Sequence, residues 1–335
     1  MPTPPPLPPE RQDLTIAGFG IGHGSDLEGK TGVTVVLCPD GAVAAADLRG
    51  SATGTRQFDS LIHPHHIANR AHALVLAGGS GFGLDCGGPV ADELARRGKG
   101  FATGLRPVPL VPTAILFDLA FGDPNAAPGP ELVRRALASA DGFEPGSRVP
   151  TGSVGAGTGA TVGKALGPAS GMKSGIGFAS YEVPGGVTVA ALVAVNAFGD
   201  VHDPEKGTVI AGCRTEPDGH ELAHAERVLA ALPPETEHVW EGNTTLAVVL
   251  TDAALSKLAL TKVCHMAFGG LYRTIRPCLS LYDGDLVAAL STATKPAHLH
   301  QVAVLAEQAV AGAVISAVRD ADGFGLLPTA RDLAH

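Results

Sequence analysis

Four consecutive residues place a nucleophile where the chain could be cut. Gly242, Asn243, Thr244 and Thr245 follow a polar stretch and open an apolar run at residues 244–251. A threonine that becomes amino-terminal carries both a hydroxyl and a base, because an α-amine with a pKa of about 7.7–8.0 is partly neutral near pH 7–8. Attack of the Thr244 hydroxyl on the preceding carbonyl would release that amine, with water completing the cut. Taken alone, these residues more commonly form a polar turn before a strand.

Further motifs precede this segment in a fixed order. They are GGSGFGL at residues 78–84, GAGTG at 155–159, MKSGIG at 172–177 and VAVN at 193–196. Together with GNTT at 242–245, the set resembles the self-processing DmpA-type aminopeptidases. Within them it is most similar to the 6-aminohexanoate-oligomer endohydrolases, the nylon-oligomer hydrolases. The resemblance runs from about residue 15 to residue 325.

The resemblance implies a fold and a processing event. The fold is an α/β four-layer αββα sandwich of the DmpA/ornithine acetyltransferase type, with mainly antiparallel sheets flanked by helices. A proline-rich arm at residues 1–12 is expected to precede a single catalytic domain at residues 13–335. Self-cleavage would divide that domain into residues 13–243 and 244–335. The two pieces would stay together as a heterodimer and assemble further into a homo-oligomer.

The resemblance also assigns residues that support the nucleophile. Asn196 would hydrogen-bond the oxyanion of the tetrahedral intermediate. Lys173 would lower the pKa of the α-amine, and Lys164 competes for the same role because the glycine-rich loop makes the alignment loose. Asp283 and Asp285 would anchor the α-ammonium, since side chains two apart on an extended segment share one face.

The implied activity is amide hydrolysis by an amino-terminal threonine. The substrates would be linear amides or peptides, and in particular 6-aminohexanoate oligomers or related ω- or β-amino acid amides. The alternative within the family is a DmpA-like aminopeptidase on α- or β-peptides. That branch uses serine and a site tyrosine ahead of the glycine-rich loop, whereas this chain has tyrosine only at positions 181, 272 and 282. The difference favours an endo-acting enzyme or a different pocket.

Two other functions are compatible with a self-generated amino-terminal threonine. An ornithine acetyltransferase shares the broad fold, but its usual Thr-Met-Leu processing motif is absent because Thr245 and Leu246 follow Thr244. A processed but inactive scaffold is the non-enzymatic alternative. The presence of all the site residues argues against a loss of catalytic activity.

Three further patterns have ordinary structural interpretations. The segment from Gly155 to Ala160 fits a dinucleotide-binding spacing, but neither an apolar strand nor an acidic ribose partner accompanies it. Ser80 lacks the glycine that completes a catalytic-serine elbow. His63, His65 and His66 have no carboxylate or cysteine at ligand spacing, so we expect a surface cluster and no metal site.

The composition limits the partners. The chain has 335 residues, of which 45% are hydrophobic, and a formal net charge of −9, which argues against binding to nucleic acid. Five scattered cysteines without a C-x-x-C pair suit reduced thiols in the cytoplasm. We find no secretory signal and no run of about 18 apolar residues, so no membrane contact is expected. The threonine chemistry needs neither metal nor organic cofactor.

The elements that must position these residues can be predicted from periodicity. We expect a hairpin of strands 31–38 and 42–47 around Pro39-Asp40-Gly41, because turn residues separate two apolar runs. The other expected strands are 72–76, 111–119, 175–182, 187–196 and 244–251. The expected helices are 89–97, 131–140, 221–232, 256–275 and 296–319. Thr244 thus begins a strand directly after an exposed linker at 233–243.

Overall fold

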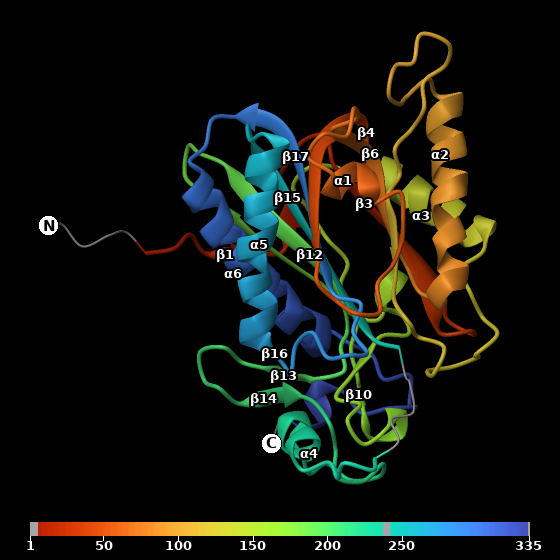
Figure 1. Cartoon of the computed structure of the whole chain (residues 1–335), viewed down its shortest axis with the longest axis vertical. Helices are drawn as coiled ribbons and strands as arrows, with labels where there is room; N and C mark the ends of the chain where they lie inside the picture. The colour runs from red at the N-terminus through yellow and green to blue at the C-terminus, as the bar shows by residue number, and fades with distance from the viewer. Residues whose placement is uncertain (1–5, 237–241, 334–335) are drawn as a thin grey trace, which may run out of the picture.

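The computed structural model describes residues 6–236 and 242–333. Residues 1–5 of the predicted arm and residues 237–241 of the predicted linker lie outside the described residues. The last part of the predicted arm is attached to the folded domain, because β1 (Glu10–Arg11) pairs with β11 at one edge of the largest sheet. Figure 1 shows this sheet at the centre of the molecule with helices on both sides.

The largest sheet has ten strands in the order β1-β11-β12-β15-β17-β4-β6-β7-β5, with β3 paired to β4 off this path. Two neighbouring pairs, β15 with β17 and β6 with β7, are parallel, and the others are antiparallel. The remaining bounds in this sheet are β3 Gly20–Asp26, β4 Thr31–Leu48, β5 Gly54–Arg56, β6 Arg70–Ala77, β7 Thr113–Ile115, β11 Ile176–Glu182, β12 Thr188–Asn196, β15 Thr244–Ala253 and β17 Leu286–Lys295.

Three small sheets and six helices complete the described structure. The small sheets pair β9 (Thr161–Val162) with β10 (Met172–Lys173), β2 (Asp13–Leu14) with β8 (Ser147–Arg148), and β13 (Asp200–His202) with both β14 (Val209–Ala211) and β16 (Ile275–Arg276). The helices are α1 Asp59–Ile62, α2 Gly87–Arg96, α3 Pro130–Asp141, α4 Ala225–Ala230, α5 Lys257–Thr274 and α6 Leu299–Arg319. Short 3₁₀ turns are at Ser80–Cys86, Gly155–Gly157, Pro168–Ser170 and Ala330–Asp332.

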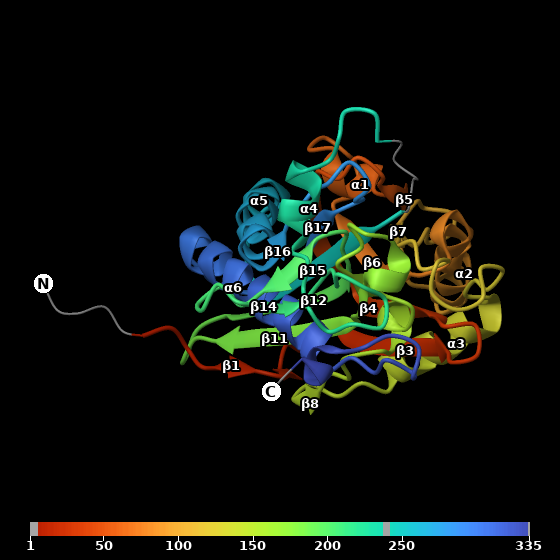
Figure 2. The same cartoon turned by 90° about the horizontal axis from the view of Figure 1, so that it is seen from below.

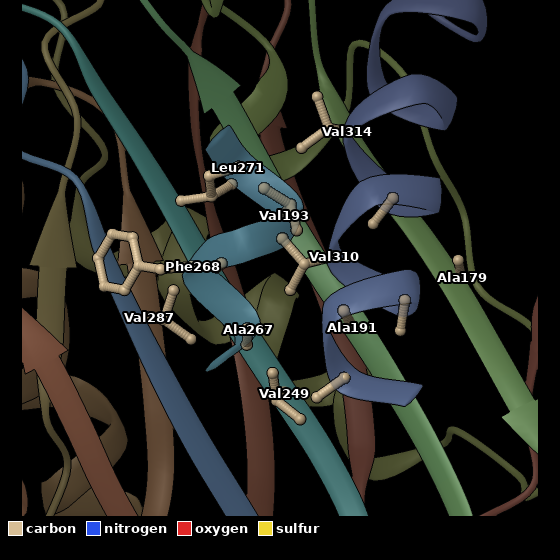
Figure 3. Close-up of a cluster of buried hydrophobic side chains, with 14 of the residues drawn as sticks. Ala179, Ala191, Val193, Val249, Ala267, Phe268, Leu271, Val287, Val310 and Val314 are labelled. Carbon is tan, nitrogen blue, oxygen red and sulfur yellow. The ribbon is translucent and has the colours of Figure 1, made fainter. Parts of the chain in front are cut away.

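Three groups of buried apolar side chains separate four layers. On β12, Ala191 and Val193 lie on the face toward α5 and α6, while Ala190 and Leu192 face the opposite core, because successive side chains of a strand alternate between its two faces. A third core lies beneath α2 and α3. Figure 2 shows α5 and α6 on one side of the sheets and α2 and α3 on the other, and Figure 3 shows the first of these cores. The predicted αββα fold class is confirmed.

The long strand β4 belongs to both sheet layers. In its first half Val35 packs toward α2 and α3, whereas in its second half Ala45 packs toward α5 and α6. Val36 and Ala44 face the core between the two layers. One continuous strand therefore passes from one sheet layer to the other, and its main-chain hydrogen bonds join the two layers into one sheet.

The predicted hairpin around Pro39-Asp40-Gly41 is wrong for this reason. Both halves of β4 pair with β6, at Leu37 with Ala73 and at Ala42 with Ala71. The register shift between these pairs absorbs the extra residues as a bulge, and Gly41 takes a φ of +81° there. The turn residues bend the strand and do not reverse it.

Other predicted elements agree with the structure except in two regions. The strand expected at 111–119 is limited to β7, and the helix expected at 221–232 is limited to α4. Strands β3 and β17 are not among the expected elements, and the β3 sequence GIGHGSD lacks apolar alternation. Its glycines let α3 approach closely: a Cβ on Gly22 would lie 2.0 Å from the Ala136 carbonyl oxygen.

Helix α6 is long and apolar enough to span a membrane by length and composition, with a mean hydropathy of 1.6 over its most apolar window. However, 61% of that window is buried inside the protein. Its valines and alanines pack against α5 and the sheet, so its apolar character is explained by the core that it forms.

Candidate active site

Thr244 begins β15 in the middle of the large sheet. Its Cα is the partner of the Asn196 Cα at the end of β12, and β15 runs parallel to β17 on its other side. The apolar residues that follow Thr244 fix this position, because alternate side chains of β15 enter the cores on its two faces. Thr244 is 2% exposed and Asn243 is 1% exposed. The predicted nucleophile and the peptide bond before it are therefore buried, and the exposed linker expected up to residue 243 does not include Gly242 and Asn243.

Main-chain groups of the segment before β17 hold the peptide bond between Asn243 and Thr244. The Asn243 N–H donates to the Tyr282 carbonyl over 3.0 Å, and the Gly284 N–H donates to the Asn243 carbonyl over 3.2 Å. The Thr244 hydroxyl also donates to the Asn243 carbonyl. The hydroxyl oxygen thus lies beside the carbonyl group that it would attack. The Gly284 N–H points at the oxygen on which negative charge would develop.

Gly284 permits this close approach because it has no side chain. A Cβ at this position would lie 2.7 Å from the Thr244 hydroxyl oxygen and 2.6 Å from the Ala52 carbonyl oxygen. The second contact is with main chain, which cannot rotate away as a side chain could. A larger residue would therefore displace either the hydroxyl or the peptide bond.

The two predicted aspartates bind main-chain donors around the same bond. Asp285 accepts the Thr245 N–H over 2.6 Å, and Asp283 accepts the Phe198 N–H over 3.1 Å. Burial raises the pKa of both carboxyl groups, and burial together with the charge of Asp283 raises the pKa of Asp285 to about 8. An α-ammonium formed at Thr244 would favour their ionised forms, so the pair is suited to holding such a charge.

Lys164 and Asn196 form a buried polar pair where β12 ends. The Lys164 ammonium donates to the Asn196 side-chain oxygen over 3.0 Å and to the Asn196 main-chain carbonyl over 3.3 Å. It also donates to the Thr161 hydroxyl over 3.0 Å. The Asn196 amide nitrogen donates to the Phe117 carbonyl over 2.7 Å. These contacts fix the orientation of the amide, and the Lys164 charge opposes the rise in the pKa of Asp283.

Lys173 is fully buried among carbonyl groups of the glycine-rich segment. Its ammonium donates to the Gly157 carbonyl over 3.2 Å and to the Ala160 carbonyl over 2.9 Å. Burial lowers the pKa of Lys173 to about 7, although the Asp118 carboxylate opposes this shift. In the β9–β10 pair its Cα partner is Thr161, whose N–H donates to the Asn196 side chain over 3.0 Å.

Four of the five predicted site residues surround one peptide bond. They are Thr244, Asn196, Asp283 and Asp285. The lysine in direct contact with this group is Lys164, the alternative that the sequence left open. Lys173 is linked to Asn196 through Thr161. A glycine-rich loop has no periodic pattern from which its path can be predicted. The sequence could therefore not decide which of the two lysines enters the site.

Sequence reasoning missed the main-chain donors and acceptors at Tyr282 and Gly284, and it missed Phe117. Main-chain groups have no residue-type signal, because every position except proline offers the same N–H and C=O. The one available signal was the glycine between the two aspartates. The fold alone brings Phe117 to the site, since it follows β7 in a distant part of the chain.

The other sequence patterns take no part in this site. A Cβ on Gly155 would lie 2.2 Å from the Thr34 hydroxyl oxygen, so this glycine-rich turn packs closely against β4. His63 and His65 are exposed beyond α1, where their rings are in edge-to-face contact. Within residues 6–236 and 242–333, no group of three His, Cys, Asp or Glu side chains is arranged to hold a metal ion.

The fold is similar to the Ntn hydrolase fold. The structure of L-aminopeptidase D-Ala-esterase/amidase from Ochrobactrum anthropi, described as a variant of that fold, superimposes with a TM-score of 0.69 at 19% identity and covers 98% of this chain and 93% of that chain. A Burkholderia sp. beta-aminopeptidase superimposes with a TM-score of 0.67 at 20% identity, covering 99% of this chain and 97% of that chain.

The family model described as peptidase family S58 matches residues 14–324, and the chain belongs to this family of amide hydrolases. An uncharacterized aminopeptidase of Mycobacterium tuberculosis (strain ATCC 25618 / H37Rv) is 36% identical over 95% of this chain and 96% of its own length. A 6-aminohexanoate-oligomer endohydrolase of Paenarthrobacter ureafaciens is 33% identical over 82% of this chain and 73% of its own length. The resemblance predicted from the sequence motifs is confirmed.

Proposed function

We propose that the chain cuts itself between Asn243 and Thr244 and then hydrolyses linear amides with the freed amino-terminal threonine. One observation carries the proposal: the Thr244 hydroxyl contacts the Asn243 carbonyl, and that carbonyl also accepts the Gly284 N–H. A nucleophile, its target and an oxyanion donor are thus together at one buried bond. The family of amide hydrolases to which the chain belongs supports this function.

The proposed cut has two steps. The Thr244 oxygen bonds to the Asn243 carbonyl carbon, the carbon–nitrogen bond breaks, and the hydroxyl proton is transferred to the departing nitrogen. The product is an ester on the threonine side chain and a free α-amine. Water then adds to the ester carbon, which leaves the Asn243 carboxylic acid and restores the Thr244 hydroxyl.

In the mature enzyme the neutral α-amine of Thr244 would take the hydroxyl proton as the hydroxyl attacks a substrate amide. Asn196 and the Gly284 N–H would stabilise the oxyanion, and Lys164 would keep Asn196 in place. Removal of one donor from a protease oxyanion hole costs about 2.7–4 kcal/mol of transition-state stabilisation. Asp283 and Asp285 would hold the α-ammonium after proton transfer. Water would release the acyl group.

The two fragments would remain together after the cut. Strands β15 and β17 of the smaller fragment lie between β12 and β4 of the larger fragment, so both edges of the smaller fragment's sheet are paired. Helices α5 and α6 also pack over strands of both fragments. We propose a heterodimer that assembles further in the cytoplasm, with small linear amides or peptides as its ligands.

We propose 6-aminohexanoate oligomers and related ω- or β-amino acid amides as the first substrates, on the basis of the endohydrolase relatives. The names of the mycobacterial relatives and of the superimposed structures favour a second candidate, an aminopeptidase acting on α- or β-peptides. Hydrolysis of amino-blocked against free-amine substrates would separate the two, because an aminopeptidase needs the free amine.

Intact mass of the purified protein tests the proposed cut. The wild type should give two fragments divided at Asn243 and Thr244, and Thr244→Ala should stay whole. Thr245→Ala is the matched control, because it removes the neighbouring buried hydroxyl and should still be cut. A wild-type chain that stays whole after long incubation at several pH values and temperatures would refute self-processing.

A further inference from the structure

The segment before Thr244 shows how an acyl group can lie in this site. In the uncut chain the Thr244 hydroxyl faces the Asn243 carbonyl, and in the mature enzyme the same hydroxyl would face the substrate carbonyl. Gly242 and Asn243 therefore occupy the acyl side of the future site. We propose that this side is a narrow slot, walled by Phe117, which takes an acyl chain that carries no branch at the position of the Gly242 α-carbon. The inference rests on the proposed self-cleavage.

The path of the chain into the slot is fixed by main-chain pairing. Asn243 forms a parallel bridge with Asp283, in the same register as the pairing of Leu246 with Leu286 farther along β15. The bonds to Tyr282 and Gly284 hold both the N–H and the carbonyl of Asn243 against this segment. An acyl group with its carbonyl on the Gly284 N–H must therefore extend in the direction that Asn243 and Gly242 now take.

Phe117 closes the slot one residue before Asn243. A Cβ on Gly242 would lie 2.7 Å from Cγ, 2.8 Å from Cβ and 2.9 Å from Cδ2 of Phe117. Cβ and Cγ lie on the axis about which the ring rotates, so ring rotation does not remove these two contacts. The main chain of Phe117 is also fixed, because its carbonyl accepts the Asn196 amide over 2.7 Å and the Leu116 N–H donates to Ala77 over 2.9 Å.

Counting atoms identifies the chemical class that fits. In a 6-aminohexanoyl group the second to sixth carbons follow the path of the Asn243 α-carbon and nitrogen and then the three main-chain atoms of Gly242. The fifth carbon, a methylene, falls on the Gly242 α-carbon and packs on the Phe117 ring. A peptide fits only with glycine at that position. The slot thus accepts linear ω-amino acyl chains and glycine-containing peptides.

The first test uses the chain as its own substrate. Gly242→Ala should slow self-cleavage, by about 10- to 200-fold if the added methyl group costs what one methylene costs at a closely fitting apolar site. The penalty should shrink strongly when the same change is made in a Phe117→Ala background, because the wall has been removed. Gly81→Ala, where nothing lies within 4 Å of the added Cβ, is the matched control.

The measurement is intact mass over time, with thermal unfolding showing that each variant folds. Absence of a penalty for Gly242→Ala, or an equal penalty in both backgrounds, overturns the slot while leaving self-cleavage intact. A wild-type chain that is never cut refutes the proposed function itself. The two failures are therefore distinguishable.

A second test uses the mature enzyme on two blocked peptides that contain Gly-Asn or Ala-Asn before the cut bond, beside a 6-aminohexanoate oligomer. The wild type should prefer the glycine peptide over the alanine peptide in kcat/KM, and Phe117→Ala should lose most of that preference. Phe82→Ala, which changes an aromatic ring that is 72% exposed, should retain it. Equal rates for the two peptides with the wild type would contradict the slot.

Discussion

Replacing Lys164 by methionine should slow self-cleavage without removing the nucleophile. The side chain is 5% exposed, and its ammonium donates two hydrogen bonds to Asn196, at 3.0 and 3.3 Å. A hydrogen bond to a charged group contributes about 1.5–3 kcal/mol. If this whole energy is lost from the stabilisation of the transition state, cleavage slows by about 10- to 150-fold, at 1.36 kcal/mol per factor of ten. Methionine fills similar space, so the core is largely preserved.

Time courses of intact mass would measure the rate, and far-UV circular dichroism with thermal unfolding would report the folded fraction. Lys173→Met is the informative comparison, since Lys173 bonds to Gly157 and Ala160 and should affect mainly stability. Lys262→Met, on the exposed side of α5, controls for loss of a positive charge. A folded Lys164→Met protein that is cut at the wild-type rate would refute the direct role of Lys164, and a folded, uncut Lys173→Met protein would transfer that role to Lys173.

Two further predictions concern the segment that faces the nucleophile. Asp285→Asn, made in the uncut Thr244→Ala protein, should flatten the dependence of Tm on pH. The folded pKa of Asp285, about 8, is above the unfolded value of about 3.9, so its contribution to stability is complete below about pH 4 and is lost as the pH rises through about 8. An unchanged slope of Tm over pH 4–8 would contradict that shift. Gly284→Ala should prevent the cut, because its Cβ would lie 2.7 Å from the Thr244 hydroxyl oxygen. Gly129→Ala, in open space, should be cut normally, and efficient cutting of Gly284→Ala would show that the close approach is not needed.

The sequence predicted the segment of the proposed nucleophile and most of the elements around it. Periodicity is a local property, so β12 and β15 could be predicted from their apolar runs, as could α5 and α6. Thr244 could be placed at the first residue of a strand because a proline pair and polar residues precede it. Ordered motifs then selected the family.

The structure alone decided how these elements meet. Pro39-Asp40-Gly41 reads locally as a reversal, but pairing of both halves of β4 with β6 turns it into a bulge. The sequence does not distinguish Lys164 from Lys173, because both lie in a glycine-rich region. Only the fold brings Lys164 to the end of β12, where it donates to Asn196. The contacts of Phe117 and Gly284 with the segment of the proposed cut join residues far apart in the chain. Local pattern predicts which segments are strands, whereas long-range pairing and close packing determine which side chains reach one peptide bond.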